Sequence, residues 1–403
     1  MSAWAVTTAG ASLEFDTQNH TYNSCYQIDA NHFINFWQGS NYDGFVQVFA
    51  VNTSTWAVTT ANSTLEFATQ SNYANSCYKV DTNHFINFWG GADYDGFVQV
   101  FTVNTSTWAV TTANSALEFD TQLGDENSCY QIDANHFINF WVGVNGKGFV
   151  QVFTVNTSTW AVTTANSVLN FDTQSARYNS CYQIDANHFI NFWGNKTGTE
   201  AYSQVFTVNT STWAVTTAGN SIKYFTDNIS YNSCSQIDTT HYINFWRDDI
   251  GVDGEVQVFT VNTSTWAVTT AGSSFTFDTG DGSRNSCFPV DSTHFINFYS
   301  GTDSDGFAVV VSVNTSTWAV TTANSALEFD TQSNSYNSCS KIDANHFINF
   351  WGGVNGKGFV QVFTVEGAAG PAKLKTLNTV AKSSIKTINT NTIANTKTYN
   401  TIT

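Results

Sequence analysis

Proline, methionine and basic residues are scarce in this chain of 403 residues, which has two Pro, one Met and 14 Lys and Arg against 31 Asp and Glu. The formal charge of −17 at pH 7 describes an acidic protein that repels phosphate backbones, so nucleic-acid binding is not expected. No segment approaches the roughly eighteen unbroken apolar residues of a membrane-spanning helix. The opening residues MSAWAVTTAG contain neither a basic region nor an apolar core, so we expect no signal peptide of the usual kind.

Repetition dominates what the chain does contain. A unit of about fifty-two residues occurs seven times and reads NTSTWAVTTA, LEFDT, NSCYQID, NHFINFW, a Gly-rich turn and GFVQVF. Such units cannot bury their apolar faces alone, so residues 1–366 are expected to form one cooperative body. The Trp of the unit recurs at Trp4, Trp56, Trp108, Trp160, Trp213, Trp266 and Trp318.

One repeat predicts four antiparallel strands joined by short turns. The composition, rich in Thr, Phe, Val and Trp, favours β-structure. Asp and Asn side chains in DTNH, an Asp-Gly pair in GGADYDG and the NTST segment supply three turns. In the second repeat the expected strands are Ser76–Asp81, His84–Trp89, Phe97–Val103 and Trp108–Phe119.

Both faces of the predicted strands are apolar. In HFINFW, Phe85 and Trp89 point to one side of the sheet while Ile86 and Phe88 point to the other. A sheet with one solvated face would alternate apolar with polar residues, so each sheet is expected to lie between two others, as in a propeller. A β-solenoid is the main alternative, but three turn signals per repeat are many for a single coil.

The ends of the repeat array complement each other. The chain opens with a fourth-strand segment, Ala3–Phe15, while the last repeat, Asn337–Val365, stops after its third strand. The first segment can therefore supply the missing outer strand of the last blade and remove an exposed edge. The sequence predicts an all-β fold, a closed seven-bladed β-propeller of four-stranded antiparallel blades.

The repeat also resembles a known group. Units of the form S-x-x-Q-I-D-x-x-x-F and G-x-x-x-D-G-F-x-x-x-F, followed by L-E-F-D, resemble repeats of environmental phage, viral and bacterial proteins. Those repeats are predicted seven-bladed propellers, often within larger surface or tail-associated chains. The resemblance covers residues 1–366 and implies an architecture, but no catalytic motif.

Cysteine and histidine each occupy one fixed place in the repeat. We expect the Cys to be buried, reduced thiols, because equivalent strand residues of a ring lie too far apart for disulfides. We expect each His to hydrogen-bond to the Asp-x-Asn turn before it rather than to form a metal-binding or pH-sensing ring. The seven Cys are Cys25, Cys77, Cys129, Cys181, Cys234, Cys287 and Cys339. The seven His are His32, His84, His136, His188, His241, His294 and His346.

No metal site and no cofactor is expected. Asp93–Gly96 and Asp303–Gly306 contain an Asp-x-Asp-Gly string, but the full calcium loop with its terminal Glu is missing, so plain hairpins are expected. Six Asn-Thr-Ser strings match a glycosylation acceptor, yet they stand where a hairpin needs a turn. Nucleophile-elbow, Walker and dinucleotide-binding fingerprints do not occur.

Differences between the repeats concentrate in two classes of loop, which a four-stranded blade places on one face of the ring. These are the second-to-third hairpins, such as 39–44 and 194–202, and the crossovers between blades, such as 18–23 and 280–285. Rigid scaffolds commonly bind through such loops, although unconstrained drift would produce the same pattern. The candidate ligand-binding residues of this variable rim are Tyr42, Asp43, Tyr73, Tyr94, Asp95, Arg177, Tyr178, Tyr202, Arg247, Asp248, Arg284 and Asp303.

Beyond the repeats the composition changes. Residues 367–371 (GAAGP) are expected to be a linker. Residues 372–403 form a Thr/Asn/Lys-rich tail in which KTLN, KTIN and KTYN recur every eleven residues. This tail carries five Lys and no acid, so the rest of the chain is at −17 − 5 = −22. It is expected to order through self-association or against a partner, or else to remain a solvated extension.

These observations predict a non-enzymatic ligand-recognition propeller. Tyr, Asn and Asp loops suit a glycan or a host-surface protein, which points to adhesion or viral host recognition by an extracellular or virion-associated protein anchored through its tail. A structural subunit of a virion or extracellular assembly is the alternative. An enzyme acting on polysaccharides is the least favoured hypothesis, because a catalyst needs an asymmetric set of groups and the repeat supplies the same neighbours seven times.

Overall fold

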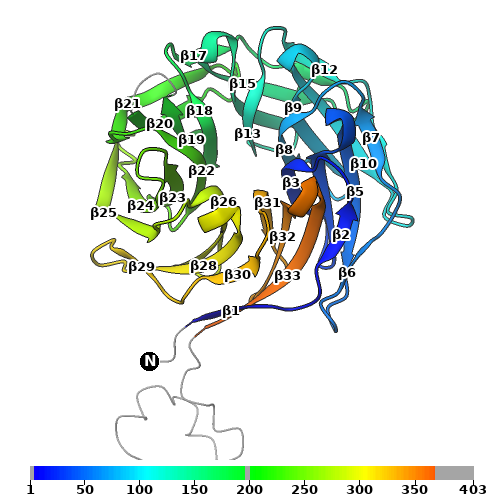
Figure 1. Cartoon of the computed structure of the whole chain (residues 1–403). Coiled ribbons are helices and arrows are strands. Elements are labelled where there is room, and N and C mark those ends of the chain that lie inside the picture. The colour runs from blue at the N-terminus through cyan, green and yellow to red at the C-terminus, as the bar shows by residue number, and fades with distance from the viewer. Residues whose placement is uncertain (1–3, 196–199, 368–403) are drawn as a thin grey trace, which may run out of the picture. The chain divides into compact units, whose positions relative to one another are not determined.

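Seven antiparallel sheets are arranged as a ring in a computed structural model of the chain (Figure 1). The structure describes residues 4–195 and 200–367, and Trp4–Glu366 form one compact unit. The predicted all-β, seven-bladed propeller is thereby confirmed. No helix in the described part is long and apolar enough to cross a membrane. The tail 372–403, and the linker 367–371 apart from its first residue, lie outside the described residues.

Within each blade the first three strands lie in sequence order, with the first strand next to the central channel and the second strand outside it. The first strands are β3 Thr21–Gln27, β8 Tyr73–Lys79, β13 Asp125–Gln131, β18 Arg177–Gln183, β22 Ile229–Gln236, β26 Ser283–Pro289 and β31 Ser335–Lys341. The second strands are β4 His32–Gln38, β9 His84–Gly90, β14 His136–Val142, β19 His188–Asn195, β23 His241–Asp248, β27 His294–Ser300 and β32 His346–Gly352.

The third strands and the hairpins before them come next. The third strands are β5 Gly44–Val51, β10 Gly96–Val103, β15 Gly148–Val155, β20 Glu200–Val208, β24 Gly254–Val261, β28 Gly306–Val313 and β33 Gly358–Glu366. Five of the hairpins contain a short 3-10 turn: η1 Ser40–Tyr42, η2 Ala92–Tyr94, η3 Val144–Gly146, η4 Thr302–Ser304 and η5 Val354–Gly356.

The outer strands differ from the prediction. In five blades the expected single strand is two: β6 Val58–Thr60 with β7 Leu65–Ala68, β11 Val110–Thr112 with β12 Leu117–Asp120, β16 Val162–Thr164 with β17 Leu169–Asp172, β29 Val320–Thr322 with β30 Leu327–Asp330, and β1 Ala5–Thr8 with β2 Leu13–Asp16. Only β21 Val215–Phe225 and β25 Val268–Asp278 are continuous.

An Asn side chain marks the break between β6 and β7, between β16 and β17 and between β29 and β30, whereas Gly10 stands at the same place between β1 and β2. Between β6 and β7, the Oδ1 of Asn62 accepts the N–H of Val48 at 3.1 Å and so replaces a main-chain carbonyl in the ladder. β21 has Gly219 at the equivalent place, with φ of +68°, and the backbone stays paired through a bulge. The first strands are also displaced, since β8 begins at Tyr73 and not at Ser76.

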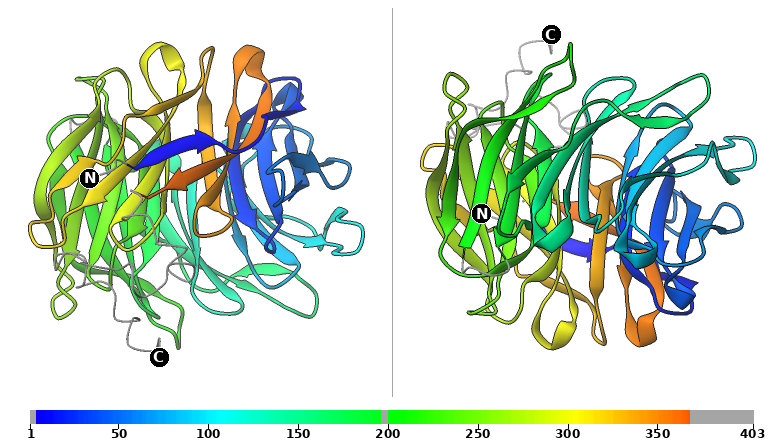
Figure 2. Two further views of the ribbon diagram at one scale, coloured as in Figure 1. Left: turned by 90° about the horizontal axis from the view of Figure 1, so that it is seen from below. Right: turned by 90° about the horizontal axis from the view of Figure 1, so that it is seen from above.

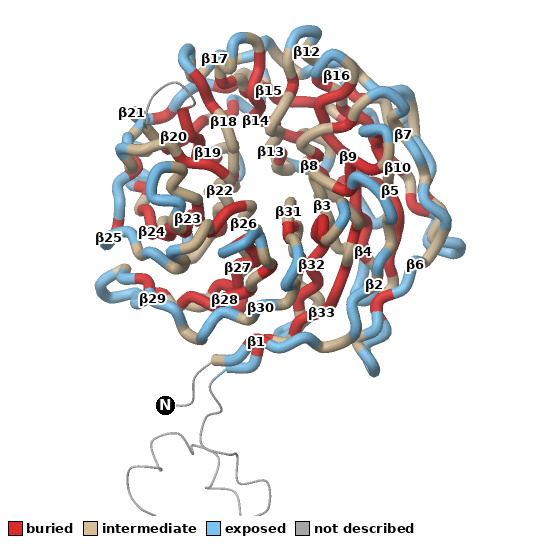
Figure 3. Tube along the Cα trace, in the orientation of Figure 1, coloured by how far each residue is buried: buried red, intermediate tan, exposed pale blue. Residues whose placement is uncertain are grey.

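Two-sided burial of the middle strands is confirmed. Phe85 of β9 packs with Ile34 and Phe36 of the preceding blade, while Ile86 and Phe88 pack against the following one. All five side chains are fully buried. In Figure 3 the red, buried stretches lie mainly in the second and third strands of each blade, and the pale blue, exposed stretches lie mainly at the outside of the ring. The wedges therefore hold each other, as the repeat pattern requires.

The turn between the first and second strands has the predicted Asp–His contact, and it also has a His–Trp stack that was not predicted. Asp81 Oδ1 accepts the main-chain N–H of His84 at 2.9 Å and lies 2.9 Å from its Nδ1. The His84 ring also stacks on Trp160 of the next blade, with ring centroids 3.5 Å apart. Trp160 is in the left-handed region, at φ of +60°, where Gly would be easier. The stacking contact explains why Trp, and not Gly, occupies this left-handed position.

The cysteines hold neighbouring first strands together. Cys77 N–H donates to Ser24 Oγ of the preceding blade at 2.9 Å, and its thiol donates to the Ser24 carbonyl at 3.3 Å. All seven thiols are free, as predicted; Cys77, Cys129 and Cys181 are buried, whereas the other four cysteines are half-buried. Burial raises the pKa of each of them, to about 12 at Cys129 and Cys181, so they remain protonated at neutral pH.

Ring closure follows the prediction. β1 pairs with β33 in antiparallel register from Ala5↔Glu366 to Thr8↔Phe363. Figures 1 and 2 show the blue N-terminal strand lying beside the orange last strand at the outer edge of the seventh blade. Val6 is buried there like its equivalents in the other blades, so the edge of β33 is covered.

Candidate functional site

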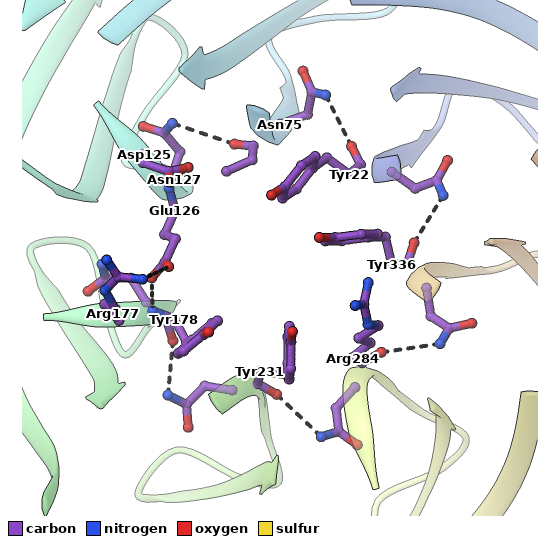
Figure 4. A pocket seen from close by; sticks show the side chains of 16 residues that line it. Tyr22, Asn75, Asp125, Glu126, Asn127, Arg177, Tyr178, Tyr231, Arg284 and Tyr336 are labelled. Carbon is purple, nitrogen blue, oxygen red and sulfur yellow. Dashed lines mark hydrogen bonds and ion pairs between the residues drawn. The ribbon is translucent and has the colours of Figure 1, made fainter. Parts of the chain in front are cut away.

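A central pocket of about 330 Å³ lies where the first strands begin. Thr21 of β3 pairs with Gln38, next to the η1 hairpin, so the pocket is on the face that carries the variable rim. Its volume is within the roughly 300–1,000 Å³ of small-molecule sites. All seven blades contribute to its lining, and Figure 4 shows their side chains converging on the channel.

One position of the repeat supplies most of the lining. It is the residue before each Asn-Ser-Cys, here named the ring position, and its side chain differs between blades. From the first blade to the seventh the ring residues are Tyr22, Ala74, Glu126, Tyr178, Tyr231, Arg284 and Tyr336. Seven equivalent backbone sites thus present aromatic, acidic, basic and small groups to one cavity.

Every ring residue has a left-handed backbone. The φ angles run from +47° at Ala74 to +58° at Tyr231. This conformation costs an L-residue roughly 1–2 kcal/mol, whereas Gly adopts it freely. None of the seven is Gly or Asn, so the ring residues are not explained by backbone needs. Strained non-glycine residues held by their surroundings are frequent at functional sites.

Constant asparagines hold this backbone in place. A bulge interrupts each first strand there, between Tyr73 and Ser76 in the second blade. Asn75 Nδ2 donates to the carbonyl of Tyr22 in the preceding blade at 3.0 Å, and Asn75 Oδ1 accepts from Asn87 Nδ2 at 2.8 Å. Because the scaffold is made by the Asn, the ring side chain is free to vary without changing the fold.

Aromatic rings and one cation form a continuous arc over five blades. The ring centroids are 4.9 Å apart for Tyr178 and Tyr231, and 4.2 Å apart for Tyr336 and Tyr22. Between these pairs, the guanidinium of Arg284 lies 4.2 Å from the Tyr336 ring and 5.4 Å from the Tyr231 ring. Burial raises the pKa of Tyr22, Tyr178 and Tyr231, so their hydroxyls stay neutral donors.

The remaining side of the pocket is acidic and open. Ala74 leaves space there, and Asp125 and Glu126 enter from β13. Arg177 lies 3.7 Å from the Glu126 carboxylate, which also accepts the N–H of Tyr178. Burial raises the pKa of Asp125, against the opposing effects of the Glu126 N–H and the Arg177 charge. A carboxyl group with a raised pKa can exchange protons at a pH closer to neutral than an ordinary Asp carboxyl can.

Three of the rim candidates, Arg177, Tyr178 and Arg284, line this pocket. Tyr73 adjoins it, since its ring stacks on Tyr94 at 5.2 Å and meets Tyr22 edge-on at 5.9 Å.

The other rim candidates lie farther out and do not meet in one place. Arg247 pairs with Asp249 and Asp281, and Asp248 caps the N–H of Ile250. Tyr202 lines a separate cavity beside Trp193 and Glu200. The remaining candidates occupy hairpin tips in or next to η1, η2 and η4: Tyr42, Asp43, Asp95 and Asp303.

Sequence reasoning missed Tyr22, Asp125, Glu126, Tyr231 and Tyr336. Four of them are the variable residue directly before an unvarying Asn-Ser-Cys, and Asp125 stands one residue earlier. Variation inside a constant strand is a sharper signal than variation in a loop, because drift in a strand is limited by packing.

No family model and no curated protein matches the chain. Solved structures do match. Two are putative 6-phosphogluconolactonases from Bacteroides fragilis (TM-score 0.58, 10% identity, 77% of this chain and 85% of that one) and Bacteroides uniformis (TM-score 0.58, 8%, 74% and 83%). A third is Sqt1 from Chaetomium thermophilum (TM-score 0.53, 12%, 86% and 83%). At these identities the matches show the fold alone. The resemblance to phage, viral and bacterial surface repeats therefore stays a prediction beyond the propeller architecture.

The prediction of a non-enzymatic recognition propeller is wrong. It assumed that a propeller of identical units has no asymmetric set of groups, but propellers of this architecture carry an enzyme's name in both Bacteroides proteins. The physical error lies in the ring position. Equivalent backbone sites hold different side chains, so the pocket brings together a carboxyl pair, two arginines and four tyrosines.

Proposed function

We propose that the chain is a hydrolase of the lactonase type, acting on a small polyhydroxylated substrate in the central pocket. The observation that supports it is the ring position, where strained, equivalent backbone sites present an asymmetric set of side chains. The names of the two Bacteroides neighbours point to the same class of reaction, as an analogy of fold.

The pocket suits a sugar-derived ring. Tyrosine faces pack against the C–H face of a sugar, and their hydroxyls donate to its oxygens. In Figure 4, Tyr22 and Tyr178 stand on either side of the acidic part of the pocket at Asp125 and Glu126. A ligand entering at this part meets hydrogen-bonding groups along the whole arc, which orients it toward Asp125.

Asp125 is the proposed general base. Its carboxylate takes a proton from a water molecule as the water oxygen attacks the lactone carbonyl carbon. The bond between that carbon and the ring oxygen then breaks, and Asp125 returns the proton to the departing oxygen. Lactone and water thus become one hydroxy acid, which releases one proton to solvent at neutral pH. The Glu126–Arg177 pair fixes the start of β13, whose first residue is Asp125.

The test is proton release from δ-gluconolactone and 6-phosphogluconolactone, measured with a pH indicator on the full chain after subtraction of spontaneous hydrolysis. We expect Asp125→Asn to lower kcat by about 100-fold or more, the usual contribution of a general base. Because burial raises the pKa of Asp125 and the carboxylate is the active form, kcat/KM should rise with pH through that raised pKa.

Asp303→Asn is the matched control, since it removes a carboxylate on the same face, in η4, far from the pocket lining. It should leave turnover unchanged. Both variants are compared with the parent by thermal unfolding. The proposal is wrong if neither lactone is turned over above background, or if a folded Asp125→Asn protein is as active as the parent.

A further inference from the structure

Arg284 stands apart from the other arginines of the chain. Arg177 lies 3.7 Å from Glu126, and Arg247 lies 2.7 Å from Asp249 and 2.5 Å from Asp281. Among the residues that the structure describes, no carboxylate is within ion-pair distance of Arg284. Its Nη1 is buried without a hydrogen-bond partner, as is the Nε of Arg177, so the distinction of Arg284 is the missing ion pair. In a repeat body with a formal charge of −22, an arginine kept away from every carboxylate is unusual.

Two tyrosines fix how this guanidinium can be approached. Tyr336 and Tyr231 lie at 4.2 and 5.4 Å from its central carbon, at cation–π distance. The guanidinium carbon thus lies over the faces of both tyrosine rings. Arg284 also lines the pocket, and its N–H donors lie in the plane of the guanidinium, where a ligand in the cavity can approach them. Tyr22 packs on Tyr336 at 4.2 Å and adds a neutral hydroxyl to the same part of the pocket.

A planar fork with an unpaired donor, held by aromatic rings, matches an oxyanion. Guanidinium groups bind carboxylate and phosphate through two parallel N–H···O bonds. A buried donor without a partner costs about 1–3 kcal/mol, which such a ligand would offset. We propose that Arg284, with Tyr22, Tyr231 and Tyr336, forms an anion subsite for a carboxylate or phosphate group of the ligand.

The arrangement of charges makes the subsite selective. Figure 4 shows Arg284 and the Asp125–Glu126 pair on different sides of the pocket. A ligand with an anionic group at one end is attracted by Arg284 and kept away from the carboxylates, so it enters in one orientation. The inference rests on the proposed function only for the sugar-like remainder of the ligand; the anion subsite itself requires no turnover.

The experiment is isothermal titration calorimetry of the full chain with glucose, gluconate and glucose 6-phosphate. These probes share a six-carbon polyhydroxylated frame and carry no anion, a carboxylate or a phosphate. We expect at least one anionic probe to bind tenfold or more tightly than glucose, with the advantage falling at high salt. Comparison of gluconate with glucose 6-phosphate identifies which anion is preferred.

Arg284→Met keeps an unbranched stem between the tyrosine rings and removes the charge. We expect it to abolish the tenfold advantage of the anionic probe while glucose affinity changes less than twofold. Arg177→Met is the matched control in the same pocket, because its charge is already paired with Glu126. It should retain most of the advantage. Arg284→Lys keeps the charge without the fork and serves if Arg284→Met does not fold.

The proposal is overturned if no anionic probe binds more tightly than glucose, or if Arg284→Met and Arg177→Met lose the advantage equally. Its failure differs from that of the hydrolase. Anion binding that depends on Arg284 without any lactone turnover would reject the reaction and keep the subsite. Turnover of δ-gluconolactone with no preference for anionic probes would keep the hydrolase and reject the anion subsite.

Discussion

At the residue scale, backbone geometry and chemistry are assigned to neighbouring positions. The Asn after each ring residue fixes the backbone, as Asn75 does through the Tyr22 carbonyl, and does not vary. The ring residue itself carries the functional group and bears the strain of a positive φ. Seven copies of one scaffold can therefore hold seven different side chains, which gives an asymmetric pocket without altering any strand.

The strain at the ring position is measurable where the side chain is smallest. Ala74→Gly should relieve about 1–2 kcal/mol of left-handed strain against roughly 0.4–1 kcal/mol of added chain entropy, so the protein should be unchanged or up to about 1.6 kcal/mol more stable. Ala50→Gly, in β5 with ordinary extended backbone, should lose about 0.5–1 kcal/mol. Chemical denaturation of both variants checks the sign; equal destabilisation would contradict a strained Ala74.

Thiol chemistry gives a second residue-scale prediction. Since burial raises the pKa of Cys25 and Cys287 to about 12, the reactive thiolate at pH 8 is on the order of one molecule in ten thousand. We expect a chromogenic disulfide reagent to titrate none of the seven cysteines within minutes in the folded protein and all seven in guanidinium chloride. Rapid labelling of any folded-state thiol would show that a first strand opens locally.

At the element scale, the turn between first and second strands is a unit of three side chains from two blades. Asp185 accepts the N–H of His188 at 2.9 Å and contacts its ring at 2.8 Å, and that ring stacks on Trp266 of the next blade at 3.5 Å. Burial raises the pKa of Asp185, but the main-chain N–H groups and His188 lower it further, so the net shift is downward. Each turn therefore links a carboxylate to the contact between blades.

This linkage predicts acid sensitivity. A carboxyl whose folded pKa is lowered stabilises the fold above its unfolded pKa, about 3.9, and loses that contribution as pH falls through the folded value. The melting temperature should thus decline from about pH 5 downward, because six such turns share the shift: Asp29, Asp81, Asp185, Asp238, Asp291 and Asp343.

A single turn isolates the effect. Asp185→Asn keeps an oxygen to cap the turn but no charge, so it should cost no more than about 1 kcal/mol at pH 7, the usual upper size of a largely solvated electrostatic contact. The difference from the parent should shrink as the pH falls below the ordinary pKa of Asp and through the lowered pKa of Asp185. Asp303→Asn, at a hairpin tip, should show no such pH-dependent difference. Scanning calorimetry from pH 3 to pH 7 makes the comparison, and a constant difference would refute it.

The elements also show what sequence can and cannot predict. Strands such as β9 and β10 were predicted closely because burial on both sides leaves a two-residue period with no polar face. The outer strand was predicted as one element because nothing in its letters shows that Asn62 Oδ1 replaces a backbone carbonyl. The pocket was missed for a related reason: Tyr22 or Arg284 in a strand-like string gives no sign of a positive φ.

At the scale of the whole molecule, the ring is completed by contacts between residues some 350 positions apart. The N–H of Ala9 donates to the Val362 carbonyl at 2.8 Å, and Gln361 Nε2 donates to the Gly10 carbonyl at 2.5 Å. Lys357 adds an ion pair to Glu14 at 2.9 Å. In the six other blades the outer strand follows the third strand directly along the chain. In the seventh blade, β1 and β2 are held to β33 by non-covalent contacts alone.

The closing strand should therefore be removable and replaceable. A chain lacking residues 1–16 loses β1 and β2 and leaves the edge of β33 unpaired, so we expect a lower melting temperature and concentration-dependent self-association. A synthetic peptide of residues 1–16 should restore the melting temperature and suppress the added self-association, because it supplies both the ladder bonds and the buried Val6. Light scattering and thermal unfolding report the two effects.

The same peptide with Val6→Asp places a charge where Val6 is buried, and should fail to restore either property. Rescue by both peptides would mean that the β1 ladder does not require its buried side chain. An unchanged melting temperature after the deletion would mean that six complete blades and a three-stranded seventh are already a stable ring. Failure of the unmodified peptide alone, with the deletion destabilising, would point to a strand that pairs only when it folds together with the rest of the chain.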